Sequence, residues 1–247
     1  MIPPSISTYV HSVKALQEKA EELSREFGIP LIENPTVMTQ GLVLSLEEQG
    51  LVLRELPYDR GRSYLHGFSD RYVSEGKDPL LRAMGGQNQL IWDLTAGWCV
   101  DAWHLCNNGH SVQALEQNPV VFAMTRDALE RSADSVIKNQ LSVSFGEAKD
   151  WLGNPPQARP QVIYLDPMYP QKQKKSAAVA KPLQFLKLMC EETEDDTLQS
   201  LVLDSLKIAT RRVVVKRPIK AAAVANKKLS GSTRGKLVRF DIYSAHS

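Results

Sequence analysis

The sequence has little of what several classes of protein require. Only three of its 247 residues are cysteines, an odd number, which argues against a disulfide-stabilised scaffold and favours a reducing cytoplasm. Its apolar runs end far short of the roughly 20 residues that cross a membrane, and its N-terminus lacks the basic and apolar segments of a secretory signal. The formal net charge is only +2, which excludes a wholly basic nucleic-acid coat but permits a local basic face. Because 43% of the residues are hydrophobic, the chain is expected to fold.

The apolar pattern predicts a small N-terminal accessory region over residues 1–75. Apolar residues at helical spacing predict a helix over residues 12–27. Two strand-like runs, at 42–46 and 51–56, are separated by a short polar turn and predict a β-hairpin. We therefore expect this region to be a compact α/β extension of a larger core.

Residues 76–247 form that core, in which predicted strands and helices alternate. Strands are expected at 90–94, 111–115, 141–145 and 162–165, helices at 79–84, 101–108, 120–131 and 198–209, and further β-structure at 213–215 and 237–243. This alternation predicts a doubly wound, Rossmann-like α/β fold with a mostly parallel sheet. Ligands bind such sheets beyond the carboxyl ends of the strands, so we expect the chemistry in the loops after Leu94, Leu115, Phe145 and Leu165.

Two of these loops have features of a nucleotide-cofactor site. The loop of residues 93–101 joins a strand to a helix and contains Gly97, which lets a ligand approach the backbone closely. The full G-x-G-x-x-G pattern is absent, because Cys99 stands where a second glycine is usual. Glu116 ends the next strand, 19 residues after Gly97, at the usual place of the acceptor for ribose hydroxyls, and Gln117 is placed to border an adenine. A tight turn and a solvated strand-end charge are the structural alternatives.

The most specific single motif is Asp166-Pro167-Met168-Tyr169-Pro170, directly after an apolar strand. It resembles the Asp/Asn-Pro-Pro-Tyr/Phe motif of methyltransferases that act on exocyclic amines of bases, although Met168 departs from the usual second proline. Such an amine is a poor nucleophile, so an acceptor such as Asp166 must hold its N–H groups in place, and Tyr169 offers a ring on which a base can stack. The alternative is a proline-rich structural turn.

Further blocks extend this resemblance to most of the core. They are Asp93-Leu94-Thr95-Ala96-Gly97 with Asp101, Leu115-Glu116-Gln117-Asn118-Pro119-Val120, the run 162–170 with Lys172-Gln173-Lys174, Arg212-Val213-Val214-Val215-Lys216-Arg217-Pro218, and Arg239-Phe240-Asp241-Ile242-Tyr243. Together they resemble the RsmJ-type 16S ribosomal RNA guanine-N2 methyltransferases. The resemblance implies a class I methyltransferase fold with an antiparallel C-terminal strand.

The same resemblance implies an activity and its partners. The expected activity is N2-methylation of one guanine near the 3′ end of 16S ribosomal RNA, with S-adenosylmethionine as donor and S-adenosylhomocysteine as product. The expected partner is the small ribosomal subunit, in the cytoplasm, with no membrane and no obligate protein partner.

The resemblance also assigns donor contacts, and one of the loops involved departs from the family. The implied contacts are Val100, Asp101, Glu116, Gln117, Glu147, Ala148 and Asp166, beside Gly97. The family's first loop usually reads Gly-Leu-Gly-Arg-Asp, whereas residues 97–101 read Gly-Trp-Cys-Val-Asp. Cysteine disfavours the positive φ that glycine permits, so the loop is expected to close around the donor if the φ angle of Cys99 is negative.

Basic residues near the predicted pocket are candidates for RNA contact. They are Lys172, Lys174, Lys175, Lys216 and Arg217. We expect them to bind phosphates and to set the register of the RNA without reading its sequence; the ordinary alternative is a solvated charge run. No metal is expected, because the spacing of Cys99, His104, Cys106 and His110 matches no common zinc module.

Three other functions stay open at this stage. The motif also permits an adenine-N6 amino-methyltransferase on nucleic acid. A nicotinamide-dependent oxidoreductase would need a fuller glycine pattern and a hydride-transfer acid, neither of which is evident. A non-catalytic RNA-binding or ribosome-assembly factor would result if Cys99 has removed the affinity for the donor.

Overall fold

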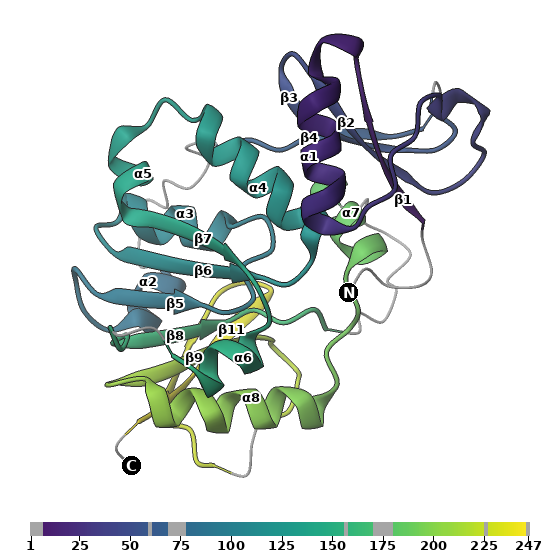
Figure 1. The fold of residues 1–247 in the computed structure, drawn as a ribbon. Coiled ribbons are helices and arrows are strands. Elements are labelled where there is room, and N and C mark those ends of the chain that lie inside the picture. Colours follow the sequence, from purple (N-terminus) through teal and green to yellow (C-terminus); the bar gives the residue numbers. More distant parts are fainter. Residues whose placement is uncertain are drawn as a thin grey trace. The chain divides into compact units, whose positions relative to one another are not determined.

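The computed structural model describes residues 7–58, 61–68, 78–155, 158–169, 180–224 and 227–245. Their strands form two sheets, one of four strands and one of seven (Figure 1). The four-stranded unit comprises the segments Met1–Phe68, Asn118–Ala133 and Lys174–Glu191. The seven-stranded unit comprises Ser69–Gln117, Asp134–Gln173 and Glu192–Ser247. The division of the chain into an accessory region and a core at residue 75 stays a prediction.

The four-stranded unit contains the predicted helix and hairpin. Its strands are β1 (Thr8–Ser12), β2 (Leu42–Glu47), β3 (Gly50–Glu55) and β4 (Ser63–Leu65), in that order across the sheet. Strands β2 and β3 are antiparallel, so the predicted hairpin is confirmed, whereas β1 pairs with β2 in parallel and was not expected. Its helices are η1 (Lys14–Leu16), α1 (Gln17–Phe27), η2 (Pro35–Val37), α4 (Pro119–Arg131) and α7 (Lys181–Met189). The helix predicted over residues 12–27 begins only at Gln17, because Ser12 belongs to β1; it ends at Phe27 as predicted, before Gly28, whose φ of 64° suits a glycine.

The sheet of the seven-stranded unit has the predicted mostly parallel order. Its strands are β5 (Leu90–Asp93), β6 (Ser111–Glu116), β7 (Leu141–Phe145), β8 (Val162–Leu165), β9 (Arg212–Pro218), β10 (Gly231–Arg234) and β11 (Val238–Ser244). The order across the sheet is β10-β11-β9-β8-β5-β6-β7. The five strands from β9 to β7 are parallel, and β11 is antiparallel to β9. The expected antiparallel C-terminal strand is therefore confirmed.

Helices cover both faces of this sheet. They are α2 (Pro79–Met84), α3 (Val100–Asn107), α5 (Ser135–Gln140), α6 (Ala148–Gly153) and α8 (Asp195–Ile208). In Figure 1, α6 and α8 lie in front of the sheet, and α2 and α3 lie behind it. On α8, Leu198, Val202 and Leu206 recur every four residues and form one buried stripe, which packs in a cluster with Trp92 and Ile163. Neighbouring residues on a strand point to opposite faces of the sheet. Asp93 and Lys216 therefore lie on one face, and their neighbours Trp92 and Val215 lie on the other.

The pattern did not predict several short elements. Helices α5 and α6 have six residues each, and β10 has four. Their few apolar residues did not distinguish them from loops, whereas the start of the equally short α2 is marked by Pro79 directly after Asp78. Among the described residues, no helix combines the length and the apolar character that crossing a membrane requires.

A buried ion pair on β11 gives a prediction for stability. Arg239 donates to both carboxylate oxygens of the fully buried Asp241, at 2.8 and 2.9 Å. We expect Asp241→Ala to lower the free energy of unfolding by about 3–5 kcal/mol, because it leaves a buried guanidinium without its counter-charge. Asp204→Ala removes the exposed pair with Lys207 on α8 and should cost less than about 1 kcal/mol. Urea denaturation measures both values, and equal losses would contradict the assignment.

Candidate active site

Four ionisable side chains gather where parallel strands of the seven-stranded unit end. Asp93 is the last residue of β5 and Glu116 the last of β6, Asp166 directly follows β8, and Lys216 lies near the end of β9. These strands are parallel neighbours, so their carboxyl ends share one edge of the sheet. This is the edge at which the sequence predicted the chemistry.

The loop after β5 is held in an unusual backbone conformation. Both Gly97 and Cys99 have a φ of 52°, in the left-handed region. The negative φ that the sequence analysis required of Cys99 is therefore absent, and the loop closes with a left-handed cysteine. This conformation costs a non-glycine residue roughly 1–2 kcal/mol. The cost is borne because Cys99 is the N-cap of α3: its amide donates to the Ala96 carbonyl at 2.8 Å, and its carbonyl accepts from the amide of Trp103 at 2.8 Å.

The side chain of Cys99 is completely buried. Burial, with the nearby carboxylates of Asp93 and Glu116, raises the pKa of its thiol well above the usual range. Cys99 is therefore a neutral packing residue rather than a nucleophile, since the thiolate is the reactive form.

The same loop is hydrogen-bonded to Glu116 on one side and to Asp166 on the other. The amide of Gly97 donates to Oε2 of Glu116 at 2.7 Å, and the amide of Asp166 donates to Oγ1 of Thr95 at 2.6 Å. The amide of Gly146 donates to the carbonyl of Glu116 at 3.1 Å, which brings the loop after β7 to the same place. Glu116 and Asp166, 50 residues apart in the chain, thus meet around residues 95–97.

Lys216 lies between two carboxylates. Its Nζ atom is 2.8 Å from Oδ2 of Asp101 and 2.8 Å from Oδ2 of Asp166. The hydroxyl of Tyr164 donates to the same oxygen of Asp101, at 2.6 Å. Asp101, from the first turn of α3, is thereby connected to Asp166 through a single ammonium group.

Burial and this ammonium group act in opposite directions on the pKa values of the carboxyls. For Asp101, burial is outweighed by the attraction of Lys216, and its pKa is lowered. For Asp166, burial and the charge of Asp101 outweigh Lys216, and its pKa is raised. Burial also raises the pKa of Asp93 well above its usual range, which favours the neutral form of that acid. The two carboxylates override the burial of Lys216, whose own pKa is raised.

Tyr169 lies against a second cation. The guanidinium carbon of Arg217 is 4.6 Å from the centroid of the Tyr169 ring. Arg217 is only 4% exposed; its Nη2 donates to the Ala222 carbonyl at 3.0 Å, and its Nη1 lies 3.6 Å from a carboxylate oxygen of Asp195. Burial raises the pKa of Tyr169, so its hydroxyl stays protonated at neutral pH.

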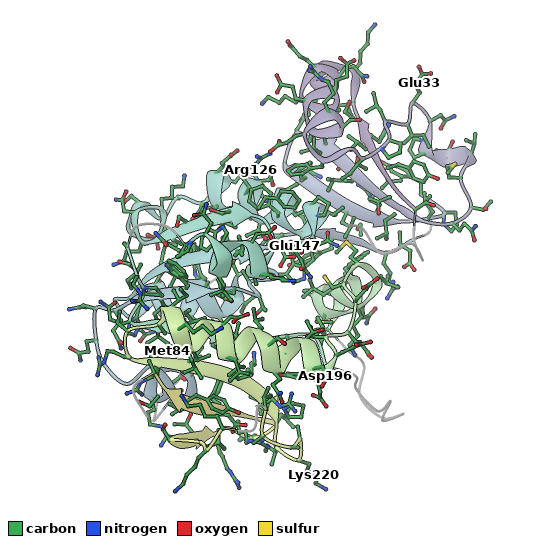
Figure 2. All side chains as sticks on the ribbon, turned by 60° about the horizontal axis from the view of Figure 1, so that its bottom comes forward. Glu33, Met84, Arg126, Glu147, Asp196 and Lys220 are labelled. Atoms are coloured by element: carbon green, nitrogen blue, oxygen red, sulfur yellow. The ribbon has the colours of Figure 1, made fainter. Side chains whose placement is uncertain are left out.

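The other predicted donor contacts lie on the same loops. Val100 is the first residue of α3 and is 50% exposed, Gln117 is exposed after β6, and Ala148 begins α6. Glu147, labelled in Figure 2, is exposed just before α6. Each of these residues follows the carboxyl end of a strand, as predicted, but their contact with a donor stays a prediction.

The predicted RNA contacts divide into two groups. Lys172, Lys174, Lys175 and Pro170 lie outside the described residues. Lys216 and Arg217 are held inside the site by the contacts given above, where the sequence had suggested a basic surface. Within the described ranges, no group of three or more His, Cys, Asp or Glu side chains is arranged to hold a metal ion.

Asp93, Thr95 and Tyr164 stand in the motif blocks of the sequence, but no role in the site was predicted for them. The signal for Tyr164 was strand alternation, because it lies two residues before Asp166 and so on the same face. Nothing local marked Thr95, since its role depends on how β5 and β8 are paired.

Comparisons with known proteins bear on the family and the fold of the chain. Residues 39–245 match the model of a family described as putative SAM-dependent methyltransferase. The chain is 35% identical to ribosomal RNA small subunit methyltransferase J of Thioalkalivibrio sulfidiphilus, covering 92% of this chain and 93% of that protein. It is also 35% identical to the protein of that name from Nitrosococcus oceani, covering 92% and 94%. The crystal structure of a SAM-dependent methyltransferase from Neisseria gonorrhoeae superposes with a TM-score of 0.72 at 24% identity, covering 96% of both chains, which supports the fold.

The left-handed cysteine gives a prediction for this loop. Cys99→Val should lower the free energy of unfolding by about 2 kcal/mol or more, because a β-branched residue tolerates the left-handed region poorly and the site is fully buried. Cys99→Gly should change it by no more than about 1 kcal/mol, since relief of strain offsets the greater entropy of the unfolded chain.

The matched control is Cys106→Val, a buried cysteine inside α3 that lacks this backbone strain. Denaturation with urea would compare the three variants. If Cys99→Val were no less stable than Cys106→Val, the strain assigned to residue 99 would be absent.

Proposed function

The chain belongs to the family of S-adenosylmethionine-dependent methyltransferases that contains ribosomal RNA small subunit methyltransferase J, and from this membership we propose that it methylates N2 of one guanine near the 3′ end of 16S ribosomal RNA. One observation carries the proposal. The loop of residues 95–97 is hydrogen-bonded to Asp166 on one side and to Glu116 on the other. A donor held by Glu116 and an amine held by Asp166 would then meet beside a single loop.

The residues of this edge fit the donor. The carboxylate of Glu116 has about four lone-pair positions, so the bond from Gly97 leaves capacity for ribose hydroxyls. Val100, Asp101, Gln117, Glu147 and Ala148 would complete the donor site from the neighbouring loops. When bound, S-adenosylmethionine supplies a methyl group on a sulfonium cation and leaves as S-adenosylhomocysteine. An edge rich in carboxylates suits such a cation.

Asp166 would act on the acceptor amine. The lone pair of the guanine N2 amine is delocalised into the ring, so the amine must be turned before it can react. Asp166 would accept hydrogen bonds from the N–H groups, direct the lone pair toward the methyl group, and take up the proton that the nitrogen loses. Tyr169, fixed by Arg217, would stack on the base extruded from the RNA. The cluster of Lys172, Lys174 and Lys175 would bind phosphates of the RNA.

A variant of Asp166 tests the catalytic assignment. We expect Asp166→Ala to reduce methyl transfer to small ribosomal subunits by about 10²–10⁴-fold, because it removes both the orienting acceptor and the proton acceptor. Thermal melting should show a folded protein. Asp196→Ala, an exposed aspartate on α8 that is labelled in Figure 2, is the control and should retain normal turnover. Turnover by Asp166→Ala within a few-fold of the unaltered protein would refute the amine-orienting role.

The base and position are tested in cells. In a strain that lacks the gene, mass mapping of 16S ribosomal RNA should show the loss of one N2-methylguanosine near the 3′ end. The intact gene should restore it, and the Asp166→Ala variant should not. An unchanged set of methylguanosines would remove the proposed function, whereas loss of an N6-methyladenosine would favour the adenine-directed activity. Absence of S-adenosylmethionine binding by calorimetry would favour a non-catalytic RNA-binding or assembly factor.

A further inference from the structure

Two consecutive basic residues near the end of β9 contact different parts of one motif. Neighbouring residues on a strand point to opposite faces of the sheet. Lys216 accordingly reaches Asp166 and Asp101, from the face on which α3 lies. Arg217 reaches Tyr169, which packs against the core cluster of the α8 face. One dipeptide therefore holds both ends of the segment Asp166-Pro167-Met168-Tyr169.

The surroundings of both residues are poorly suited to binding RNA phosphates. Two of the three donor positions of the Lys216 ammonium are directed at carboxylates 2.8 Å away. A phosphate that approached Lys216 would have to displace one of them and would meet the remaining negative charge. Arg217 is 4% exposed, which leaves its guanidinium little surface on which a phosphate could bind.

We infer that Lys216 and Arg217 are positioning residues of the methyl-transfer site: Lys216 fixes one carboxylate oxygen of Asp166, and Arg217 fixes the ring of Tyr169. This inference rests on the proposed function for the roles of Asp166 and Tyr169. With one oxygen held by Lys216, the carboxylate of Asp166 has a defined orientation toward the target amine. With one face covered by a guanidinium, the tyrosine ring has a defined plane for stacking.

Lys216 also affects the protonation of Asp166. The titratable or charged groups around that carboxyl are Asp93 from β5, Asp101 from α3, Tyr164 from β8, Lys216 from β9 and Tyr169 from its own loop. Burial and Asp101 raise the pKa of Asp166, and Lys216 opposes them. Asp166 must be ionised to accept the N–H groups. Loss of the ammonium would therefore raise its pKa further and shift the acidic limb of the rate profile to higher pH.

The first experiment compares Lys216→Met with Lys220→Met, which removes an exposed lysine just beyond β9 (labelled in Figure 2). The substrate is the small ribosomal subunit from the deletion strain, with saturating S-adenosylmethionine. Lys216→Met should lower kcat by about 10²-fold, as expected for a misplaced catalytic group, with an unchanged salt dependence of KM for the RNA. Lys216→Arg should recover part of kcat. Lys220→Met should leave kcat unchanged.

A phosphate contact would give the opposite pattern. If Lys216→Met raised KM for the RNA, kept kcat, and reduced the slope of log affinity against log salt by about one, the positioning role would be refuted. For Arg217→Met we expect a fall in kcat, again with an unchanged salt slope. Arg217→Lys should recover little, because an ammonium does not stack as a planar guanidinium does.

The pH profile separates positioning from a merely structural effect. The acidic limb of kcat/KM should move to higher pH in Lys216→Met and to lower pH in Asp101→Asn, since that variant removes the neighbouring negative charge. A structural defect would lower the rate without moving the limb in opposite directions. If the acidic limb of kcat/KM lies at the same pH in both variants as in the unaltered protein, the inference is overturned.

A measurement that does not depend on RNA separates the positioning role of Lys216 from the proposed function. The carboxyl carbon of Asp166 can be titrated by NMR in the unaltered protein, in Lys216→Met and in Asp101→Asn. A higher pKa in the first variant and a lower one in the second support the role of Lys216 even if no RNA is methylated, in which case only the proposed function fails. Should the lysine variant not fold, Asp101→Asn alone tests the coupling, and an unshifted Asp166 refutes it.

Discussion

A single ammonium group, that of Lys216, holds two partly buried carboxylates together at the carboxyl edge of the larger sheet. Asp101 and Asp166 come from different elements and would repel each other, since both carboxylates are partly withdrawn from water. Lys216 lies 2.8 Å from both and offsets that repulsion, and the Tyr164 hydroxyl supplies a further donor. Removal of the ammonium would leave two partly buried negative charges facing each other without a counter-charge. The site is therefore best understood as one unit.

The second constraint is the loop between β5 and α3. Its turn is tight because Gly97 and Cys99 are both left-handed, and this conformation directs the Gly97 amide at Glu116 while Thr95 receives the amide of Asp166. Cysteine at residue 99 retains the backbone path expected of glycine, at a cost in strain. Residue 99 thus departs from the family pattern in its residue type, while its φ is one that glycine adopts readily.

Much of this arrangement could be predicted from the sequence because it depends on local patterns. The strand that ends at Glu116, the hairpin of β2 and β3 and the apolar strand before Asp166 all have periodicity or turn residues that mark them. The environment of Lys216 could not be predicted in this way. A lysine in sequence is most often solvated, and the partial burial of Lys216 follows only from the placing of β9 beside β8. Likewise β1 pairs with β2, 34 residues further on, which no local pattern indicates.

Strand alternation explains how so few residues organise the site. Tyr164 and Asp166 are two residues apart and lie on one face, so both reach the group formed by Asp101 and Lys216. Lys216 and Arg217 are adjacent and lie on opposite faces, so they contact the two ends of one motif. A shift of a single residue in β9 would exchange these faces, so Lys216 and Arg217 could no longer both reach the parts of the motif that they contact now. The register of β9 against β8, in which Leu165 pairs with Val215, is therefore as much a part of the site as the charged side chains themselves.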